Sequence, residues 1–282
     1  MKHYIPVLTI AGSDSCGGAG IQADIKTISA LGCYAASAIT SITVQNTLGV
    51  TAVQSVEPDI VARQIRAVMD DIKPKAVKVG MVNDAATIRA IASVLREYAP
   101  DNLVVDTVMV ATAGSRLMQE DALDTFRSEL MPMATILTPN ITEAEVLSGL
   151  EIKAADIAGV PADELKKVID EAARIILESG CKSVLIKGGH LSGDKIDRLY
   201  GCETHEYRCQ SVQTANTHGT GCTLSSAIAS YLALGCQLTE AVGRAKDYVT
   251  RALKAGAEVN IGEGSGPVNH FFCPERQKLT QE

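Results

Sequence analysis

Short runs of apolar, often β-branched residues alternate along this chain with longer segments in which apolar residues recur at helical spacing. The strand-like runs cover 5–11, 38–44, 50–56, 75–79, 103–106, 135–137 and 183–186. The helical segments cover 21–31, 59–72, 84–98, about 161–180 and 219–256, the last with a break near Gly235. Strands without polar alternation are typical of parallel strands that helices cover on both faces. The pattern therefore predicts a doubly wound α/β sandwich.

Neither a linker nor an internal repeat interrupts this order, so we expect one domain over residues 1–282. Two less apolar segments, 196–201 and 206–212, predict a β-hairpin or an edge pair of strands. Residues from about 267 to 282 show no clear periodicity, and we expect them to form a loose C-terminal tail.

The charge balance narrows the classes of partner. The chain carries 26 Lys and Arg against 33 Asp and Glu, a formal net charge of −7, which argues against broad nucleic-acid binding. A small anionic substrate is compatible with this charge, because backbone N–H groups can hold a phosphate locally. No run approaches the roughly 18 apolar residues of a membrane span, and the N-terminal residues lack the features of a signal peptide. We therefore expect a cytoplasmic protein that acts on a small molecule.

The eight cysteines are scattered over the chain, and no C-x-x-C pair occurs among them. This spacing gives no support to a zinc site or a redox motif. Most of these thiols are expected to be small buried side chains.

The first glycine-rich segment imitates a dinucleotide-binding fingerprint. Residues 18–23 read G-A-G-I-Q-A, but the predicted strand before them ends near Gly12, and residues 42–45 supply no acidic residue for a ribose. The chain also lacks a Walker A motif. The better interpretation is that the glycines at 17, 18 and 20 let a substrate approach the backbone at the mouth of the first strand.

The strongest single signal is the segment 216–223, N-T-H-G-T-G-C-T, which directly precedes an apolar helical run. Its glycines permit a tight turn, and successive N–H groups at a helix start form an anion hole with the helix dipole behind them. Taken alone, the segment is equally a plain glycine-rich helix start. Cys222 is then either a core thiol or a group whose pKa the helix terminus lowers.

A second candidate element is the segment 138–143, T-P-N-I-T-E, at the end of a strand and the start of a helix. Asn140 and Glu143 have the spacing of a capping box. The same two residues would also suit a magnesium ion beside a phosphate pocket. Asp106 ends a buried strand on what should be the same edge of the sheet, where ligands gather in open α/β folds.

A third element is the segment 185–190, L-I-K-G-G-H. Lys187 at the end of a strand, followed by two glycines, fits a phosphate clamp, and a solvated strand end is the alternative. His190 and His218 are each either a ligand contact or a structural loop histidine.

In combination, these segments resemble the hydroxymethylpyrimidine/phosphomethylpyrimidine kinases of thiamine biosynthesis. The resemblance is carried in order by A-G-S-D at 11–14, G-G-A-G-I-Q-A-D at 17–24, V-Q-N-T at 44–47, K-V-G-M at 78–81, D-T-V-M at 106–109, T-P-N at 138–140, K-G-G-H at 187–190 and H-G-T-G-C-T at 218–223. It continues to residues 266–271 and so covers nearly the whole chain. A single motif would be weak, whereas this ordered set is highly specific.

The resemblance implies a ribokinase-like fold, a three-layer α/β/α sandwich around a mostly parallel central sheet. It implies transfer of phosphate from ATP, with Mg²⁺, to the hydroxymethyl group of an aminopyrimidine and then to the resulting monophosphate. The partners expected are this small molecule and a second copy of the chain in a homodimer, without nucleic acid or membrane.

The resemblance also assigns roles to individual residues. On the substrate side it implies hydrogen bonds from Asp24 and Gln45 to the aminopyrimidine, within walls formed by Gly12, Ala19, Met81 and Val108. On the phosphate side it implies an anion hole at Gly219, Gly221 and Cys222, ATP or phosphate contacts at Asn140, Lys187, Thr220 and Gly221, and metal ligands at Glu143 and Asp106. Cys222 stands where the wider ribokinase-like enzymes carry an aspartate base, and its place at a helix start leads us to expect a thiolate.

Two other functions remain open. One is a pyridoxal or pyridoxine kinase of the same fold, against which Gln45 weighs because an amide pairs well with an amino-azine. The other is a non-catalytic pyrimidine sensor, against which the complete set of phosphate-side residues weighs.

Overall fold

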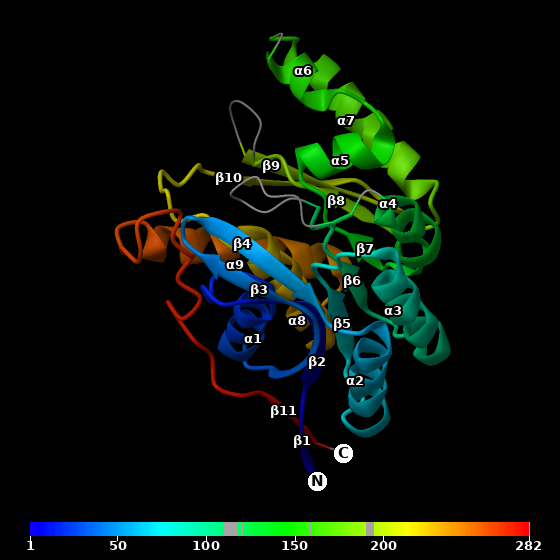
Figure 1. The fold of residues 1–282 in the computed structure, drawn as a ribbon. Helices are drawn as coiled ribbons and strands as arrows, with labels where there is room; N and C mark the ends of the chain where they lie inside the picture. Colours follow the sequence, from blue (N-terminus) through cyan, green and yellow to red (C-terminus); the bar gives the residue numbers. More distant parts are fainter. Residues whose placement is uncertain (110–117, 120, 158, 190–194, 282) are drawn as a thin grey trace.

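The computed structural model describes residues 1–109, 118–119, 121–157, 159–189 and 195–281. Their main sheet has nine strands in the order β10-β9-β8-β7-β6-β5-β2-β3-β4 (Figure 1). The strands of this sheet are β2 (Pro6–Asp14), β3 (Tyr34–Asn46), β4 (Gly49–Ser55), β5 (Ala76–Val79), β6 (Leu103–Val105), β7 (Ile136–Leu137), β8 (Val184–Ile186), β9 (Lys195–Tyr200) and β10 (His205–Cys209).

Strands β3, β2, β5, β6, β7 and β8 run parallel, whereas β4, β9 and β10 are antiparallel additions at the two edges. The carboxyl ends of the parallel strands therefore lie along one edge of the sheet. This is the edge where open α/β folds bind ligands.

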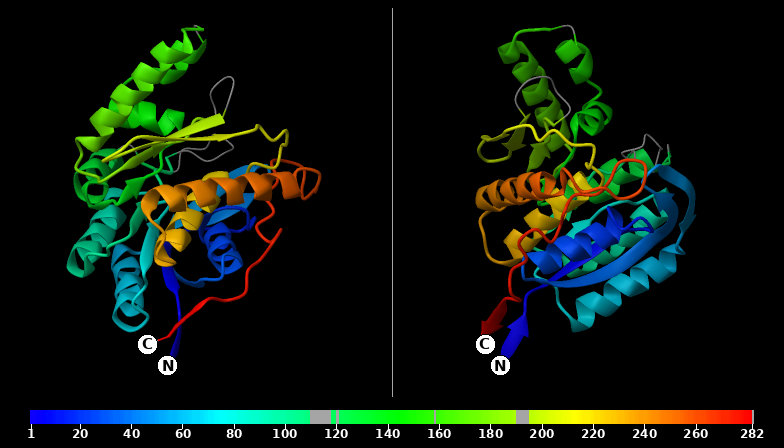
Figure 2. Two further views of the ribbon diagram at one scale, coloured as in Figure 1. Left: turned by 180° about the vertical axis from the view of Figure 1, so that it is seen from behind. Right: turned by 90° about the vertical axis from the view of Figure 1, so that its left-hand side faces the viewer.

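Helices cover both faces of the sheet, as Figure 2 shows. One face packs against α1 (Gly20–Ala30), α8 (Thr220–Ala233) and α9 (Leu238–Gly256). The other packs against α2 (Pro58–Asp71), α3 (Ala85–Tyr98), α4 (Ala122–Thr125), α5 (Ile141–Ser148) and α7 (Ala162–Leu177), with the short α6 (Ile152–Ile157) beside α7. A π-helical turn (Phe126–Leu130) and a 3₁₀ turn (Met131–Met133) follow α4.

Neighbouring strand residues alternate between the two cores. In β5, Ala76 packs with α1, α8 and α9, whereas Val77 packs with the helices of the opposite face. Both faces are thus apolar, which explains why the strands read as unbroken apolar runs. The predicted three-layer sandwich with a mostly parallel sheet is confirmed.

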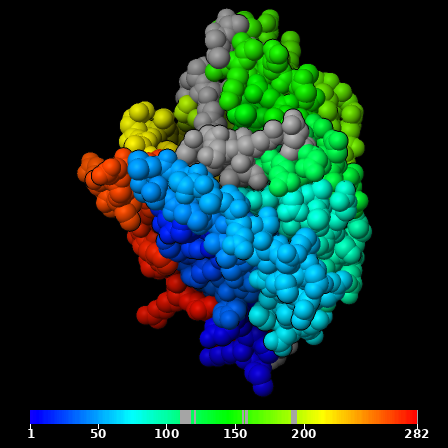
Figure 3. Space-filling view, in the orientation of Figure 1, coloured from blue at the N-terminus to red at the C-terminus, as the bar shows by residue number. Residues whose placement is uncertain are grey.

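The C-terminal segment is not the loose tail that the sequence predicted. Val268 and His270 are buried, and β11 (Leu279–Gln281) pairs with β1 (Lys2–Tyr4) in a small second sheet. Between His270 and β11 the chain lies along the surface beside the N-terminal part of the protein (Figure 3). In this stretch the N–H of Glu275 donates to Ala30 O. Backbone hydrogen bonds hold this segment, and they require no regular spacing of apolar side chains. The apolar pattern of the sequence therefore did not predict them.

In the described part of the chain, no helix is both long enough and apolar enough to cross a membrane.

Candidate functional site

Asp106 lies at the centre of the sheet's carboxyl edge. Its Oδ1 accepts hydrogen bonds from Thr138 Oγ1 at 2.9 Å and Lys187 Nζ at 3.3 Å, and its Oδ2 accepts one from Ser225 Oγ at 3.0 Å. Three parallel strands and the first turns of α8 therefore meet at one buried carboxylate, as the strand ends predicted.

Both charges of the Asp106–Lys187 pair persist in the folded protein. Burial alone would raise the pKa of Asp106, but the charges of Lys187 and Lys78 outweigh it and hold that pKa below its ordinary value. Burial alone would lower the pKa of Lys187, but Asp106 and Glu143 raise it instead. The Lys187 ammonium thus remains a cation at the floor of the site.

The start of α8 has the geometry that the predicted anion hole requires. Gly219 caps the helix at φ +78°, and a Cβ on it would lie 1.8 Å from the Gly18 carbonyl oxygen, so only glycine fits. A Cβ on Gly221 would lie 3.5 Å from Lys187 Nζ, so the lack of a side chain leaves the helix start open toward the cation. Among the described residues, no acceptor receives the N–H groups of Gly221 and Cys222. Free N–H groups beside an ammonium are suited to a phosphate.

Thr220, expected at the phosphate, makes its contacts within the turn instead. Its Oγ1 donates to Thr217 O at 2.7 Å, which closes the turn before α8. The backbone N–H of Thr220 also donates to Thr217 O, at 3.2 Å, so the geometry does not favour a phosphate contact at this position.

Burial controls the chemistry of Cys222. The thiol lies at the first turn of α8, where burial raises its pKa to about 11, while Lys78 and the Gly20 N–H act in the opposite direction. The expectation of a thiolate in the free protein is therefore wrong, because desolvation exceeds the effect of the helix terminus.

Asn140 and Glu143 form the capping box. Asn140 Oδ1 accepts from the Glu143 N–H at 3.0 Å, and Glu143 Oε2 accepts from the Asn140 N–H at 2.8 Å and from Thr107 Oγ1 at 2.9 Å. Burial raises the pKa of Glu143, and Lys187 lowers it only in part. Both side chains therefore cap the helix, and they would have to keep these hydrogen bonds while binding a metal or phosphate.

Most of the residues expected on the substrate side lie near the ends of β2, β3, β5 and β6. A Cβ on Gly12 would lie 3.2 Å from Met81 Sδ, so these two residues adjoin, and Ala19 directly precedes α1. The Gln45 amide lies 3.3 Å from His218 Nε2, in the turn that leads to α8. Val108 is half-buried and follows Asp106 by two positions. The substrate side and the phosphate side are therefore adjacent.

Asp24 is fully buried and does not reach the surface of the site. Its carboxylate accepts hydrogen bonds from Thr9 Oγ1 and Ser226 Oγ, both at 2.6 Å, and from Lys78 Nζ at 2.8 and 2.9 Å. With four hydrogen bonds and no exposure, it ties α1 and α8 to the sheet, and the geometry does not favour a direct contact with a ring.

Sequence reasoning missed Lys78, the partner of Asp24. Its side chain is fully buried, and Asp24 raises its pKa against the effect of burial. The signal was a single lysine inside the apolar strand 76–79, where a charge requires a buried partner.

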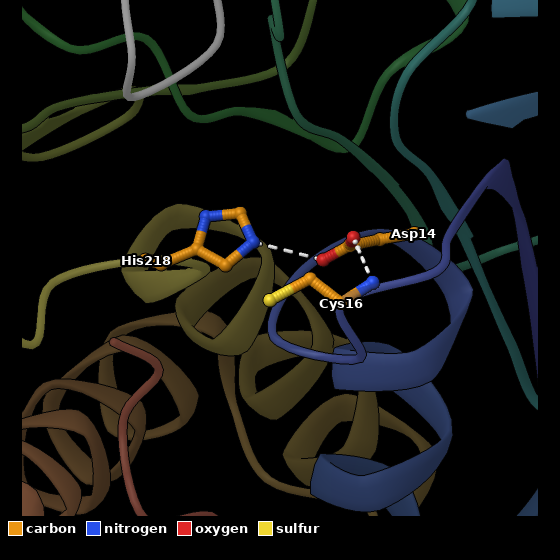
Figure 4. Close-up of side chains that lie close together, drawn as sticks. All are labelled: Asp14, Cys16 and His218. Carbon is orange, nitrogen blue, oxygen red and sulfur yellow. Dashed lines mark hydrogen bonds and ion pairs between the residues drawn. The ribbon is translucent and has the colours of Figure 1, made fainter. Parts of the chain in front are cut away.

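Asp14 was also missed, and it joins two loops (Figure 4). Its Oδ2 accepts from His218 Nε2 at 2.8 Å and from the N–H groups of Gly18 at 3.1 Å and Ala19 at 2.8 Å, and its Oδ1 accepts from the Cys16 N–H at 2.8 Å. His218, which was expected to be either a ligand contact or a structural histidine, is buried and hydrogen-bonded to Asp14. This contact is a structural one. His190 lies outside the described residues.

Asp14, Cys16 and His218 are a group, among the described residues, whose potential ligand atoms lie within 4.8 Å of one another. Three donors already occupy Asp14 Oδ2. Burial and the charge of Asp14 also raise the pKa of the Cys16 thiol, which opposes the thiolate that a metal needs. The group is better explained as a hydrogen-bonded clamp than as a metal centre.

Comparison with known proteins agrees with this geometry. Residues 14–269 match the family described as phosphomethylpyrimidine kinase. The hydroxymethylpyrimidine/phosphomethylpyrimidine kinase of Rhizobium meliloti is 48% identical over 266 residues, which cover 94% of this chain and 96% of that protein.

Two solved structures share the fold. The crystal structure of phosphomethylpyrimidine kinase from Clostridium difficile has 47% identity and a TM-score of 0.75, covering 89% of this chain and all of that one. An ADP complex of Bacillus subtilis pyridoxal kinase has 33% identity and a TM-score of 0.82, covering 95% of this chain and 97% of that one. With its sheet-edge site, its glycine-capped helix start and a match over most of its length, this chain belongs to the phosphomethylpyrimidine kinase family.

Proposed function

We propose that this protein transfers the γ-phosphate of ATP to the hydroxymethyl group of 4-amino-5-hydroxymethyl-2-methylpyrimidine, and then phosphorylates the monophosphate to the diphosphate for thiamine biosynthesis. One observation carries the proposal. The open N–H groups at the start of α8 lie beside Lys187 and Asp106. The glycine-rich loop that follows β2 adjoins them, because Gly18 contacts Gly219. A sensor would need no such phosphate site next to its ligand pocket.

In the first transfer, the hydroxyl oxygen attacks the γ-phosphorus as the bond to ADP breaks, and the hydroxyl loses its proton. In the second, a phosphate oxygen of the monophosphate attacks the γ-phosphorus of another ATP as the bond to ADP breaks. The N–H groups of Gly221 and Cys222 and the Lys187 ammonium stabilise the charge on the transferring group. Asp106 holds Lys187 in place. Cys222, at the helix start beside that group, is the proposed acceptor of the hydroxyl proton in the first transfer, and it would act through the small fraction of its thiolate form.

The residues present fit a magnesium ion. Glu143 Oε2 is occupied by two hydrogen bonds, whereas no hydrogen bond among the described residues ends on Oε1. Glu143 Oε1 and Asp106 would hold Mg²⁺, directly or through its waters, with Asn140 close to the ATP phosphates. When bound, Mg²⁺ neutralises charge on the phosphates.

Glu143→Gln tests this assignment. Glutamine also completes a capping box, so the melting temperature should stay close to that of the wild type, while the Mg²⁺ concentration for half-maximal rate rises several-fold. Glu143→Ala removes the Glu143 half of the capping box, although Asn140 still caps the helix, and should lower stability as well, by about 1 kcal/mol. Mg²⁺ titrations and thermal melts of both variants provide the measurement. An unchanged Mg²⁺ requirement in Glu143→Gln would leave only the capping role.

Gln45 is the proposed contact with the pyrimidine. Gln45→Met should lower kcat/KM for the pyrimidine alcohol by about ten- to a hundredfold, because one polar edge of the ring loses its partner. Steady-state kinetics with the pyrimidine and with pyridoxal give the comparison. If both substrates are unaffected, Gln45 does not face the ring.

Pyridoxal kinase is the second candidate, favoured by the fold shared with the Bacillus subtilis enzyme. ATP turnover measured with the pyrimidine alcohol, with pyridoxal and without an alcohol separates the three functions. We expect turnover with the pyrimidine to exceed that with pyridoxal, and a sensor would show none with either.

A homodimer and a cytoplasmic location stay predictions. For the homodimer, support comes from β3 and β4, where Ile42, Val44 and Val53 are exposed apolar side chains on the hairpin at the edge of the sheet.

A further inference from the structure

The Asp14–His218 pair extends to a third residue, Gln45. Asp14 ends β2, Gln45 is near the end of β3, and His218 stands just before α8. The His218 ring fills the space that Gly18 leaves, since a Cβ there would lie 2.4 Å from His218 Cδ2. The ring is therefore held on one side by the backbone and at Nε2 by Asp14.

Asp14 determines which atom of His218 carries a proton. Its two oxygens accept three backbone N–H groups, those of Cys16, Gly18 and Ala19. These bonds and His218 hold the pKa of Asp14 below its ordinary value, although burial opposes them. An ionised carboxylate only accepts hydrogen bonds, so His218 Nε2, at 2.8 Å from Oδ2, must donate.

The proton on His218 Nε2 in turn determines the orientation of the Gln45 amide. The amide nitrogen is placed 3.3 Å from His218 Nε2, and the amide oxygen 3.1 Å from Thr43 Oγ1. With His218 Nε2 donating, this orientation sets two donors against each other. The reverse orientation removes this conflict, because the amide oxygen can then share the His218 Nε2 proton with Asp14 in a bifurcated hydrogen bond.

Thr43 is compatible with the reversed amide. Its Oγ1 donates to Ser13 O at 3.0 Å, so its oxygen is free to accept one amide N–H from Gln45. The second amide N–H then has no partner in this network. It is a hydrogen-bond donor that Gln45 can offer to a substrate.

We propose that Asp14 and His218 are positioning residues that fix the amide of Gln45 so that it presents an N–H donor to an acceptor nitrogen of the substrate ring. The proposal rests on the proposed function for the identity of the ring. It makes the pocket selective for heteroaromatic alcohols with an unprotonated ring nitrogen at this place.

The tautomer of His218 is a test that needs no catalysis. Long-range ¹H–¹⁵N correlation spectra of the full chain, labelled with ¹⁵N-histidine, report which ring nitrogen is protonated. The His218 signals are identified by their loss in His218→Gln. A proton on Nε2, with or without one on Nδ1, supports the proposal, and a proton on Nδ1 alone overturns it.

Kinetics test the effect on the substrate. Glutamine can place an N–H near the position of His218 Nε2, whereas phenylalanine keeps the ring and loses the donor. His218→Phe should raise KM for the pyrimidine about tenfold with KM for ATP unchanged, and it should also lower the melting temperature, because Asp14 loses a buried partner. His218→Gln should retain most of the wild-type KM. His205→Gln on β10 is the matched control and should change nothing.

An unchanged pyrimidine KM in His218→Phe, or an equal rise in both KM values, would overturn the positioning role. If His218→Phe does not fold, His218→Gln and the tautomer measurement still decide. If the wild type phosphorylates neither alcohol, the proposed function fails, and the tautomer result stands by itself.

Discussion

Lys187→Met is expected to lower kcat by about two to three orders of magnitude, the usual effect of removing one donor from an oxyanion-type site. Lys187 is the ammonium that faces the open start of α8, since a Cβ on Gly221 would lie 3.5 Å from its Nζ. Methionine keeps the volume of the side chain and removes the charge. Steady-state and single-turnover kinetics at saturating ATP and Mg²⁺ give the measurement.

One control variant and the remaining contacts of Asp106 separate catalysis from folding in this experiment. Lys182→Met changes an exposed lysine just before β8 and should leave kcat unchanged. The loss of Lys187 also removes a cation from Asp106, which retains hydrogen bonds from Thr138 and Ser225, so the fold should survive. A Lys187→Met variant that keeps a third or more of the wild-type kcat would contradict the role of Lys187 at the phosphate.

Cys222→Ala is expected to reduce kcat at least tenfold with a modest change in KM, and Cys222→Asp should retain measurable activity. A positioned base contributes about 10²–10⁴ in rate. The effect here should lie toward the lower end, because phosphoryl transfer is loose and the alcohol loses its proton late. A normal kcat in Cys222→Ala would remove the base assignment and leave the backbone anion hole in place.

The raised pKa of Cys222 gives this prediction a pH signature. A thiol with a pKa of about 11 is protonated at neutral pH, and its thiolate fraction at pH 7 is about one in ten thousand. Alkylation of Cys222 by iodoacetamide should therefore be slow at pH 7 and accelerate about tenfold per pH unit toward pH 11. Site-resolved mass spectrometry follows the reaction, with the exposed Cys202 as internal reference.

ATP together with the pyrimidine should protect Cys222 from this reagent. Labelling of Cys222 at pH 7 as fast as that of Cys202 would contradict the raised pKa of the Cys222 thiol.

The periodic part of the fold could be predicted from sequence because each strand and helix buries a recognisable set of apolar side chains. The start of α8 could also be predicted from sequence, because Gly219 and Gly221 are a local signal for a turn and an open helix end. The pairing of β1 with β11 depends on backbone hydrogen bonds between exposed residues, which leave no pattern in the sequence.

Buried polar networks could not be predicted from the sequence either. His218 and Asp14 are separated by 204 positions, and Lys78 and Asp24 by 54, so only the fold brings them together. The resemblance implied a ring contact for Asp24, but its neighbours Thr9, Lys78 and Ser226 use the whole carboxylate. The pKa of Cys222 depends on desolvation, which a helix-start motif does not reveal.

The most direct test of the proposed function is a time course of the products by ³¹P NMR and mass spectrometry, with purified protein, ATP, Mg²⁺ and the hydroxymethylpyrimidine. The monophosphate should appear first and then decline as the diphosphate accumulates, with two ATP consumed per pyrimidine. The absence of both phosphorylated pyrimidines, while pyridoxal is phosphorylated under the same conditions, would contradict the assignment.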